Sequence, residues 1–305
     1  MNKNWDILGI GISAVDDLLY VDHFPQPDSK MPIRSAQRQG GGLTATALVA
    51  ASRQGARTAY CSLVSDNELS QYTIQELEKE GVDCSPCIQS PDGRPAHSFV
   101  IVDQGAGTRT IMFIPGIVDP EPEDITAELI QRCRVLFIDY LAPRAGLAAA
   151  KLAHRYGIPV VADIEPLPFP AIQEFIQEID HLIVGITLAG RLTGKTHPED
   201  MVRALANPGK ACCVVTAGKE GCWYSQQGDP VIHFPAFNIQ VVDSTGCGDV
   251  FHGAYAAALA RGEDIQRAIE VASASAAIKA TQPGGRSGIP DLRTVECFIQ
   301  ERRKA

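Results

Sequence analysis

The chain is organised around one stretch, Val242-Asp243-Ser244-Thr245-Gly246-Cys247-Gly248-Asp249-Val250-Phe251-His252-Gly253-Ala254. This stretch follows an apolar, strand-like run over 237–242, and it turns on two glycines. It then enters an apolar run over 251–259 that predicts a buried helix. A strand, a glycine turn and a helix in this order direct backbone N–H groups at a helix N-terminus, which favours an anion. The sequence therefore predicts a phosphate site at this turn.

Asp249 stands at the start of the predicted helix, beside this phosphate site. A carboxylate repels a phosphate, so it is unfavourable in a site whose sole role is to bind phosphate. It is useful if it takes a proton from a hydroxyl group that attacks the phosphate. The alternative is that Asp249 only caps a helix and that Gly246 and Gly248 only shape a turn, which is the commoner meaning of a short Gly-x-Gly.

The longer context favours the chemical interpretation. The order Asp-Ser-Thr-Gly-Cys-Gly-Asp-Val-Phe over 243–251 resembles the Asp-Thr-x-Gly-Ala-Gly-Asp-x-Phe signature of the ribokinase-like (PfkB) carbohydrate kinases. The resemblance implies an ATP-dependent phosphotransferase that uses ATP and Mg²⁺. It implies that Asp249 is the catalytic base and that the backbone of Gly246, Cys247 and Gly248 stabilises charge on the transferred phosphoryl group. Ser244 and Cys247 replace one small residue by another, so the backbone groups remain available.

Composition limits the other classes of function. The 305 residues carry a net charge of −9 and are 45% hydrophobic, which is typical of a globular protein and argues against nucleic acid or an anionic membrane as partner. The N-terminus runs directly into an apolar segment over 7–12, and no apolar run is long enough to span a bilayer, so we expect a cytoplasmic protein. Nine cysteines, mostly in apolar runs, predict reduced thiols. Cys84 and Cys87 have CxxC spacing without a second pair, so we interpret them as incidental loop thiols.

Strand, loop and helix patterns recur along the chain and predict an α/β fold with a mainly parallel sheet flanked by helices. The expected strands cover 7–12, 59–63, 135–139, 158–163, 181–184 and 212–216, and the expected helices include 69–80, 144–156, 198–205 and 268–280. Two further regions, about 14–40 and 95–115, have strand-like alternation. We place them in a small β-sheet lid inserted in a single ribokinase-like kinase domain over residues 1–305.

A second glycine motif precedes the predicted substrate site. Gln39-Gly40-Gly41-Gly42 leads into a small-residue helix that stops at Gly55, and it resembles the N-terminal signature of the same family. The resemblance implies that Gly41 and Gly42 contact substrate hydroxyl groups and that Asp16, which we place just beyond the first strand, holds two more. Thr46 stands where ribokinases carry Asn, which weakens the case for ribose itself.

The last third of the chain supplies the predicted nucleotide site. The segment from Thr216 through Gly218 to Gly221 resembles the family's Thr-x-Gly-x-x-Gly turn beside the nucleotide phosphates, although a plain hairpin turn fits equally well. The helix over 268–280 and the loop over 281–290 are implied to border the adenine, which selects Ala277 and Gly284. Loop carbonyls together with Asp243 are implied to bind a monovalent cation, K⁺. The Pro-Gly-Gly-Arg-x-Gly-Ile-Pro ending is most similar to the sulfofructose-kinase-like branch.

One element of the family pattern is missing. The positions of an Asn-x-x-Glu motif linked to magnesium and phosphate hold Gly-Ile-Thr-Leu over 185–188, so we name Asp163 or Glu165 as the substitute. The predicted activity is ATP-dependent phosphorylation of a hydroxymethyl group of a sugar or sugar-like substrate, with a ketohexose or an acidic sugar derivative favoured. A nucleoside kinase of the same fold and a non-catalytic sugar or nucleotide sensor are the alternatives.

Two expectations concern surface residues. An anionic substrate needs a cation near the lid or near Asp139, and the candidates are Lys30, Arg34, Arg94, Arg109 and Arg144. The lid strands also carry apolar residues on alternating faces, namely Leu18, Leu19, Val21, Phe99, Ile101, Ile111 and Phe113. Because exposed apolar patches and open strand edges are liabilities, we expect a homodimer that forms lid to lid.

Overall fold

A computed structural model describes residues 3–165, 172–207 and 209–304. Within them, a nine-stranded sheet forms the centre of the molecule. In spatial order it comprises β15 (Ile232–Phe234), β14 (Cys222–Gln226), β13 (Cys212–Thr216), β12 (His181–Gly185), β11 (Val160–Ile164), β10 (Val135–Asp139), β1 (Ile7–Ile10), β4 (Thr58–Cys61) and β6 (Val82–Asp83). The strands from β13 to β6 are parallel, and only β14 and β15 add at one edge in the antiparallel sense.

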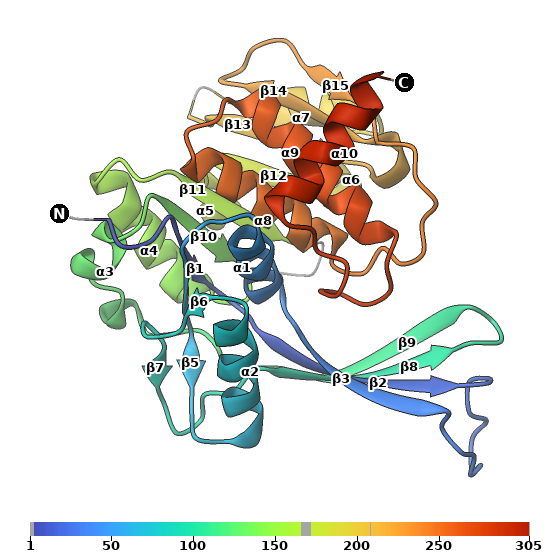
Figure 1. The fold of residues 1–305 in the computed structure, drawn as a ribbon. Helices are drawn as coiled ribbons and strands as arrows, with labels where there is room; N and C mark the ends of the chain where they lie inside the picture. The colour runs from blue at the N-terminus through green and yellow to red at the C-terminus, as the bar shows by residue number, and fades with distance from the viewer. Residues whose placement is uncertain (1–2, 166–171, 208, 305) are drawn as a thin grey trace.

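Helices cover both faces of this sheet (Figure 1). One face packs against α1 (Leu43–Arg53), α2 (Glu68–Lys79), α8 (Cys247–Ala260), α9 (Ile265–Ala280) and α10 (Leu292–Lys304). The other packs against α3 (Ala127–Gln131), α4 (Pro143–Arg155), α5 (Ile172–Gln177), α6 (Ile186–Thr193) and α7 (Pro198–Leu205). Short 3-10 turns, η1 (Pro122–Asp124) and η2 (Gly218–Glu220), complete the body. No described helix is both long and apolar enough to cross a bilayer.

The central strands show why the sequence folds in this way. In β10, Val135 and Phe137 belong to the core under α8, whereas Leu136 and Ile138 belong to the core under α4. A strand presents successive side chains to opposite faces, so a strand buried on both sides must be apolar throughout. The predicted α/β fold with a mainly parallel sheet is confirmed.

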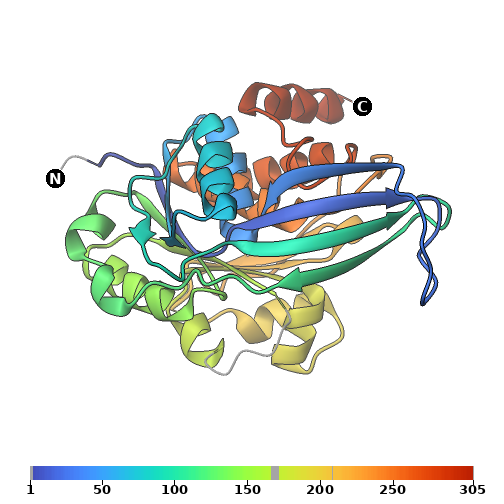
Figure 2. The ribbon, with the colours of Figure 1, turned by 90° about the horizontal axis from the view of Figure 1, so that it is seen from below.

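A second sheet extends from one end of the body, and we call it the lid (Figures 1 and 2). Its four strands are β3 (Ser35–Gly41), β2 (Ala14–Val21), β8 (Ala96–Asp103) and β9 (Thr108–Ile114), in this spatial order. The central pair β2–β8 is parallel, and both outer pairs are antiparallel. These bounds confirm the predicted small β-sheet. A separate two-stranded pair joins β5 (Leu63–Val64) with β7 (Ile88–Gln89).

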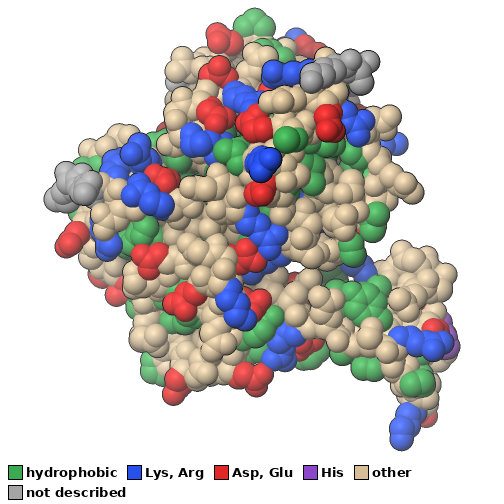
Figure 3. Space-filling model, in the orientation of Figure 1, with side chains coloured by type: hydrophobic (Ala, Val, Ile, Leu, Met, Phe, Trp, Pro, Cys, Tyr) green, Lys and Arg blue, Asp and Glu red, His purple; other side chains and the backbone are tan. Residues whose placement is uncertain are grey.

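One predicted strand is absent. The run over 237–242 is irregular, and Val241 and Val242 are each 60% exposed. Val242 N–H donates to Ala280 O at 2.8 Å, at the C-terminal end of α9. The apolar pattern was misleading because this segment pairs with a helix end instead of a strand. Elsewhere the surface is mixed, and Figure 3 shows acidic and basic side chains interspersed over one face of the molecule.

Candidate active site

The turn over 243–249 leads into α8 as the sequence predicts. Gly246 precedes the helix with φ of 74°, and a Cβ atom there would lie 2.8 Å from Gly285 O. Only glycine adopts this left-handed conformation and this close approach without strain. The turn therefore fixes where α8 begins, and it places Asp249 in the first helical turn.

The first turn of a helix leaves several N–H groups without partners inside the helix. Cys247 N–H donates back to Ser244 O at 3.2 Å, and Val250 N–H donates to Gly246 O at 2.9 Å. Among the described residues, no hydrogen bond is found for the N–H groups of Gly248 and Asp249. These two donors, at the positive end of the α8 dipole, suit an anionic ligand.

Two buried carboxylates lie at the end of the main sheet, and the charge of one of them, Asp163, acts on Asp249. Asp139 is the last residue of β10, Asp163 is the last but one of β11, and the two lie opposite each other in the parallel register. Asp139 is satisfied, because its carboxylate accepts hydrogen bonds from Ile12 N–H at 2.7 Å, Thr44 Oγ1 at 2.6 Å and Leu141 N–H at 2.9 Å. Asp163 is different. It is 5% exposed, and its Oδ2 has no hydrogen-bond partner among the described atoms.

This grouping of like charges disfavours ionisation. Burial raises the pKa of Asp249 well above its ordinary value, and the charge of Asp163 raises it further. Burial likewise raises the pKa of Asp163, with Glu165 and Asp139 adding to the shift. Such shifts are frequent where a carboxyl group acts as a catalytic base, because its pKa then approaches the working pH.

His252 links these carboxylates to the start of α8, and the sequence analysis did not select it. Its Nδ1 lies 2.8 Å from Gly248 O and 3.3 Å from Asp163 Oδ2, and its Nε2 lies 3.1 Å from Ile183 O. Burial lowers the pKa of His252, while its contacts with the two carbonyl groups oppose that shift. A polar residue within a helix that is otherwise apolar and buried was the signal that could have identified it.

On the substrate side, the position of Asp16 corrects an expectation. Asp16 does not follow the first strand of the main sheet; it lies within β2 of the lid, opposite Gln39 of β3. β1 ends at Ile10 and β2 of the lid begins at Ala14, so the connection between them is too short to include Asp16. The lid therefore carries Asp16 to the glycine motif, where a Cβ atom on Gly41 would lie 2.4 Å from Asp16 Oδ2.

Arg286 is the second site residue that the sequence analysis missed. It is 9% exposed, and it donates from Nη2 to Gly41 O at 2.7 Å and from Nε to Thr46 Oγ1 at 3.2 Å. Burial lowers its pKa, and the charges of Asp16 and Asp249 oppose this shift. Arg286 thus connects the C-terminal loop with the predicted substrate site. Its Pro-Gly-Gly-Arg context indicated a loop, but not which site the loop reaches.

The cations that we named for an anionic substrate are mostly engaged elsewhere. Arg34 pairs with Asp22 at 2.7 Å, and Arg144 pairs with Asp119 at 3.2 Å and Glu121 at 2.7 Å. Arg109 reaches from the lid to Asp243 at 3.2 Å. Lys30 is exposed on the turn between β2 and β3, and Arg94 forms an isolated backbone bridge with Ile117. Arg286 is therefore better placed than any of them.

The predicted nucleotide residues fall into two groups. Thr216 ends β13 at the same sheet edge as Asp163, with β12 between their strands, and Gly218 and Gly221 form the hairpin turn from β13 to β14. The second group follows α9. Ala277 is half-buried on this helix, and Gly284 N–H donates to Asp243 Oδ2 at 2.9 Å. Cys247 Sγ lies 3.6 Å from Ala276 O, so α9 packs directly against the 243–249 turn.

Asp243 itself is surrounded by donors. Its Oδ1 accepts from Thr245 N–H at 2.9 Å, Thr245 Oγ1 at 2.7 Å and Arg109 Nη1 at 3.2 Å. Its carbonyl oxygen accepts from Lys279 Nζ at 2.9 Å. Burial alone would raise the pKa of Asp243, but the hydrogen bonds from Thr245 and Gly284 and the charge of Lys279 outweigh it, so this pKa is lowered.

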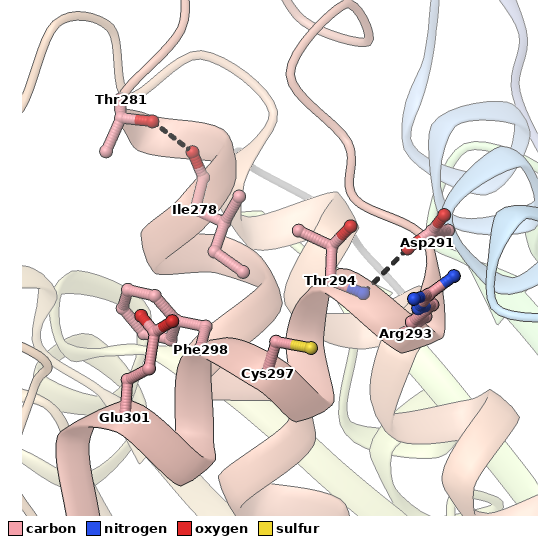
Figure 4. Close-up of a pocket in the computed structure, with 8 residues that line it drawn as sticks. All are labelled: Ile278, Thr281, Asp291, Arg293, Thr294, Cys297, Phe298 and Glu301. Carbon is pink, nitrogen blue, oxygen red and sulfur yellow. Dashed lines mark hydrogen bonds between the residues drawn. The ribbon is translucent and has the colours of Figure 1, made fainter.

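A separate surface pocket of about 590 Å³ lies between the end of α9 and α10 (Figure 4). Its lining comprises Ile278, Thr281, Asp291, Arg293, Thr294, Cys297, Phe298 and Glu301. Ile278 and Thr281 belong to the helix and loop that are implied to border the adenine, but none of the individual catalytic, substrate or nucleotide residues that we predicted lines this pocket.

Comparison with known proteins agrees with this geometry. The model of the pfkB family carbohydrate kinases matches residues 6–292. A ribokinase from Bacillus subtilis is 28% identical, over 95% of this chain and 98% of its own length. A nucleoside kinase from Methanothermobacter thermautotrophicus is 26% identical, over 95% of this chain and 94% of its own. A crystal structure from Agrobacterium tumefaciens superposes with a TM-score of 0.92 at 27% identity and covers 99% of both chains.

The match spans the glycine motif before α1, the lid strands and the 243–249 turn, so it covers each part of the candidate site. The narrower resemblance to the sulfofructose-kinase-like branch stays a prediction. The chain belongs to the pfkB family of carbohydrate kinases, and it is an ATP-dependent kinase.

Proposed function

We propose that this kinase transfers a phosphoryl group from ATP to a hydroxymethyl group of a sugar or sugar-like substrate. The observation that carries the proposal is the position of Asp249. This carboxylate lies in the first turn of α8 beside unpaired backbone donors, and burial raises its pKa. A proton acceptor and an anion site therefore occur side by side, as transfer of a phosphoryl group to an alcohol requires.

Each part of the site has a distinct role in this proposal. Asp249 takes the proton from the substrate hydroxyl group as the phosphoryl group transfers. The backbone of the turn over Gly246, Cys247 and Gly248 stabilises the negative charge, mainly through the donors of Gly248 and Asp249. Asp16, Gly41, Gly42 and Thr46 hold the other hydroxyl groups of the sugar. The nucleotide lies along Thr216, Gly218, Gly221, Ala277 and Gly284.

The carboxylates at the sheet edge fit a magnesium ion. Asp163 has a buried oxygen that accepts no hydrogen bond within the described part of the chain, and Glu165 is exposed two residues further along. Magnesium prefers oxygen ligands and keeps several waters, so a pair of carboxylates beside the phosphates suits it. We infer that Asp163 and Glu165 hold Mg²⁺ in place of the absent Asn-x-x-Glu motif. The ion would neutralise charge on the phosphates of ATP.

The finer choice of substrate rests on Arg286. A buried guanidinium that contacts Gly41 and Thr46 lies where the sugar would bind. Arginine pairs well with carboxylate, sulfonate and phosphate groups. Arg286 therefore favours an acidic sugar derivative, a ketohexose is the neutral alternative, and Thr46 in place of Asn argues against ribose.

A nucleoside kinase is the second candidate, because a relative of similar identity carries that name. A sensor that binds ligands without turnover is disfavoured by the family and by the intact 243–249 turn. An assay of ADP release across ketohexoses, sugar acids, sugar phosphates, sulfosugars and nucleosides separates these cases. Reaction with nucleosides alone would exclude the sugar assignment.

The variant Arg286→Gln tests, in the same assay, whether Arg286 selects acidic sugars. We expect KM for an acidic sugar to rise by more than KM for a neutral one, because only the acidic sugar loses an ionic partner. Arg34→Gln is the matched control, since Arg34 is an exposed lid arginine paired with Asp22. Equal losses for acidic and neutral sugars would leave Arg286 a purely structural role.

We also propose that residues 1–305 form one kinase domain that pairs through its lid. All residues of the edge strand β9 are exposed, and its apolar members Ile111, Met112, Phe113 and Ile114 are 51–61% exposed. Met112 and Ile114 share the sheet face opposite to Arg109, which contacts the site. That outer face is available to a second lid. Sedimentation of the wild type and of Met112→Asp tests this, since only the wild type should exceed the chain mass of 32.7 kDa.

A further inference from the structure

Asp243 and the loop after α9 match the part of the family pattern where a monovalent cation is implied. The groups present at Asp243 do not fit an added cation. Both carboxylate oxygens accept hydrogen bonds from the chain itself, and the carbonyl oxygen accepts from an ammonium group. Two positive charges, those of Arg109 and Lys279, already lie within 3.2 Å of Asp243 oxygens. A third cation would be repelled by both.

Of these two cations, Lys279 is the more unusual because it is buried. Lysines in the last turn of a helix are common and interact favourably with the helix dipole, but they normally extend into water. Lys279 lies in the last turn of α9, is 0% exposed, and directs its ammonium group at Asp243 O. Ionised lysine is rarely buried in this way without a specific partner.

Lys279 lies close to the predicted phosphate site, so its charge can act on a bound phosphoryl group. The N–H groups of Val242 and Asp243 both donate to Ala280 O, so the end of α9 and the start of the turn form one unit. Asp249 is close enough for the charge of its carboxylate to affect Lys279. A fixed ammonium behind the turn therefore favours the negative charge of a phosphoryl group in front of it.

We propose that the Lys279 ammonium takes the place of the monovalent cation, so that this kinase orders its phosphate-binding turn without K⁺. The inference rests on the proposed role of the 243–249 turn. Its test uses unfolding and nucleotide binding, so it does not depend on identifying the sugar.

The experiment compares the unfolding temperature, and the affinity for a non-hydrolysable ATP analogue, in KCl and in tetramethylammonium chloride of equal ionic strength. For the wild type, both quantities should be the same in the two salts. A site that bound K⁺ in the folded state would raise the unfolding temperature in KCl. A clearly higher unfolding temperature or several-fold tighter analogue binding in KCl would overturn the proposal.

Lys279→Ala removes the ammonium and leaves room for an ion. We expect a lower unfolding temperature and weaker analogue binding in tetramethylammonium chloride, with recovery of most of both losses in KCl. Lys279→Met fills the space without a charge, so KCl should not restore it. A Lys279→Ala protein that folds but does not respond to K⁺ would refute the substitution, and if neither variant folds the wild-type comparison still decides.

Lys210→Ala is the matched control. Lys210 is another buried lysine, 4% exposed, and its ammonium donates to the carbonyl groups of Ile176, Gln177 and Ile179. Its removal should lower the unfolding temperature by a similar amount, but KCl should not restore it. Equal recovery of both alanine variants in KCl would show a general salt effect and would contradict the proposal.

Discussion

Two regions on either side of Asp249 hold carboxylates in opposite states. Toward the C-terminal loop, Asp243 accepts hydrogen bonds from Thr245, Gly284 and Arg109, and its pKa is lowered. Toward the main sheet, Asp163 is buried, its Oδ2 accepts no hydrogen bond from the described residues although His252 Nδ1 lies 3.3 Å away, and its pKa is raised. A satisfied carboxylate shapes the protein, whereas an unsatisfied one has capacity left for a ligand. Asp243 therefore belongs to the structural framework of the site, whereas Asp163 belongs to the part that we expect to bind substrate and metal.

The largest effect is expected at Asp249, which lies between these regions. Asp249→Asn keeps the shape of the side chain but removes the proton acceptor. Turnover with the sugar found in the ADP-release assay should fall by roughly 10²- to 10⁴-fold, the usual contribution of a general base. The unfolding temperature should not fall, because burial already disfavours the charge of Asp249. Unchanged turnover would remove Asp249 from the mechanism.

The next effect concerns stability on the satisfied side. Asp243→Asn weakens the hydrogen bonds from Thr245 and Gly284 and leaves Arg109 and Lys279 without a countercharge. We expect a loss of about 1–3 kcal/mol in the free energy of unfolding at neutral pH. The pKa of Asp243 is lowered from 3.8, so its stabilisation is full above 3.8 and is lost as the pH falls through the lower folded value.

The pH dependence of Asp243→Asn therefore has a definite sign. Its deficit relative to the wild type should be largest near neutrality and should shrink in acid. Chemical denaturation at several pH values measures this. Asp22→Asn is a suitable control, since the Asp22 carboxylate pairs with Arg34 on the surface. A deficit that grew in acid would contradict the lowered pKa.

Asp163→Asn should change the free energy of unfolding in the opposite direction from Asp243→Asn. It removes a buried charge that lacks a full set of partners, so we expect a gain of about 1–2 kcal/mol in the free energy of unfolding at neutral pH. The pKa of Asp163 is raised above 3.8, so the wild type is penalised above the folded pKa and reaches the variant as the pH falls toward 3.8. Turnover should fall by roughly 10- to 100-fold, as for other residues that position a metal. A variant that lost stability would show that Asp163 is structural.

This contrast was only partly visible in the sequence. Asp139 and Asp163 both end apolar strands, and parallel strands bring their carboxyl ends to one edge, so their proximity could be predicted. The sequence could not show which of the two carboxylates accepts a full set of hydrogen bonds. Leu141 is a local donor to Asp139, but the donors Ile12 and Thr44 lie 127 and 95 residues away along the chain, and they reach Asp139 only through tertiary packing. Strand periodicity carries no information on such contacts.

The same reasoning explains the other successes and failures. The turn at Gly246 and the start of α8 are local, so the sequence predicted them well. Asp16 was placed just beyond the first strand instead of inside a lid strand, because the short connection after β1 gives no signal of where β2 begins. Arg286 lies 240 residues from Thr46 along the chain, and its burial depends on that long-range contact. Local patterns predict elements, whereas these contacts depend on tertiary packing.

The smallest effect tests whether the lid belongs to the satisfied region. Arg109 extends from β9 of the lid to Asp243 and Thr245, and its side chain is 45% exposed. Because exposed ion pairs contribute little, Arg109→Gln should lower the free energy of unfolding by less than about 1 kcal/mol. Its main effect should be a higher KM for the sugar, since Arg109 holds the lid against the 243–249 turn.

A double-mutant cycle of Arg109→Gln with Asp243→Asn isolates this contact. We expect a coupling energy below about 1 kcal/mol that decreases in high salt, because water screens a half-exposed pair. Lys279 should not share that salt dependence, because its ammonium is fully buried against the same aspartate. A coupling that is large and insensitive to salt would mean that the lid is part of the rigid turn. A coupling that is small and salt-sensitive, together with a raised KM, would mean that the lid closes on a turn that α9 has already ordered.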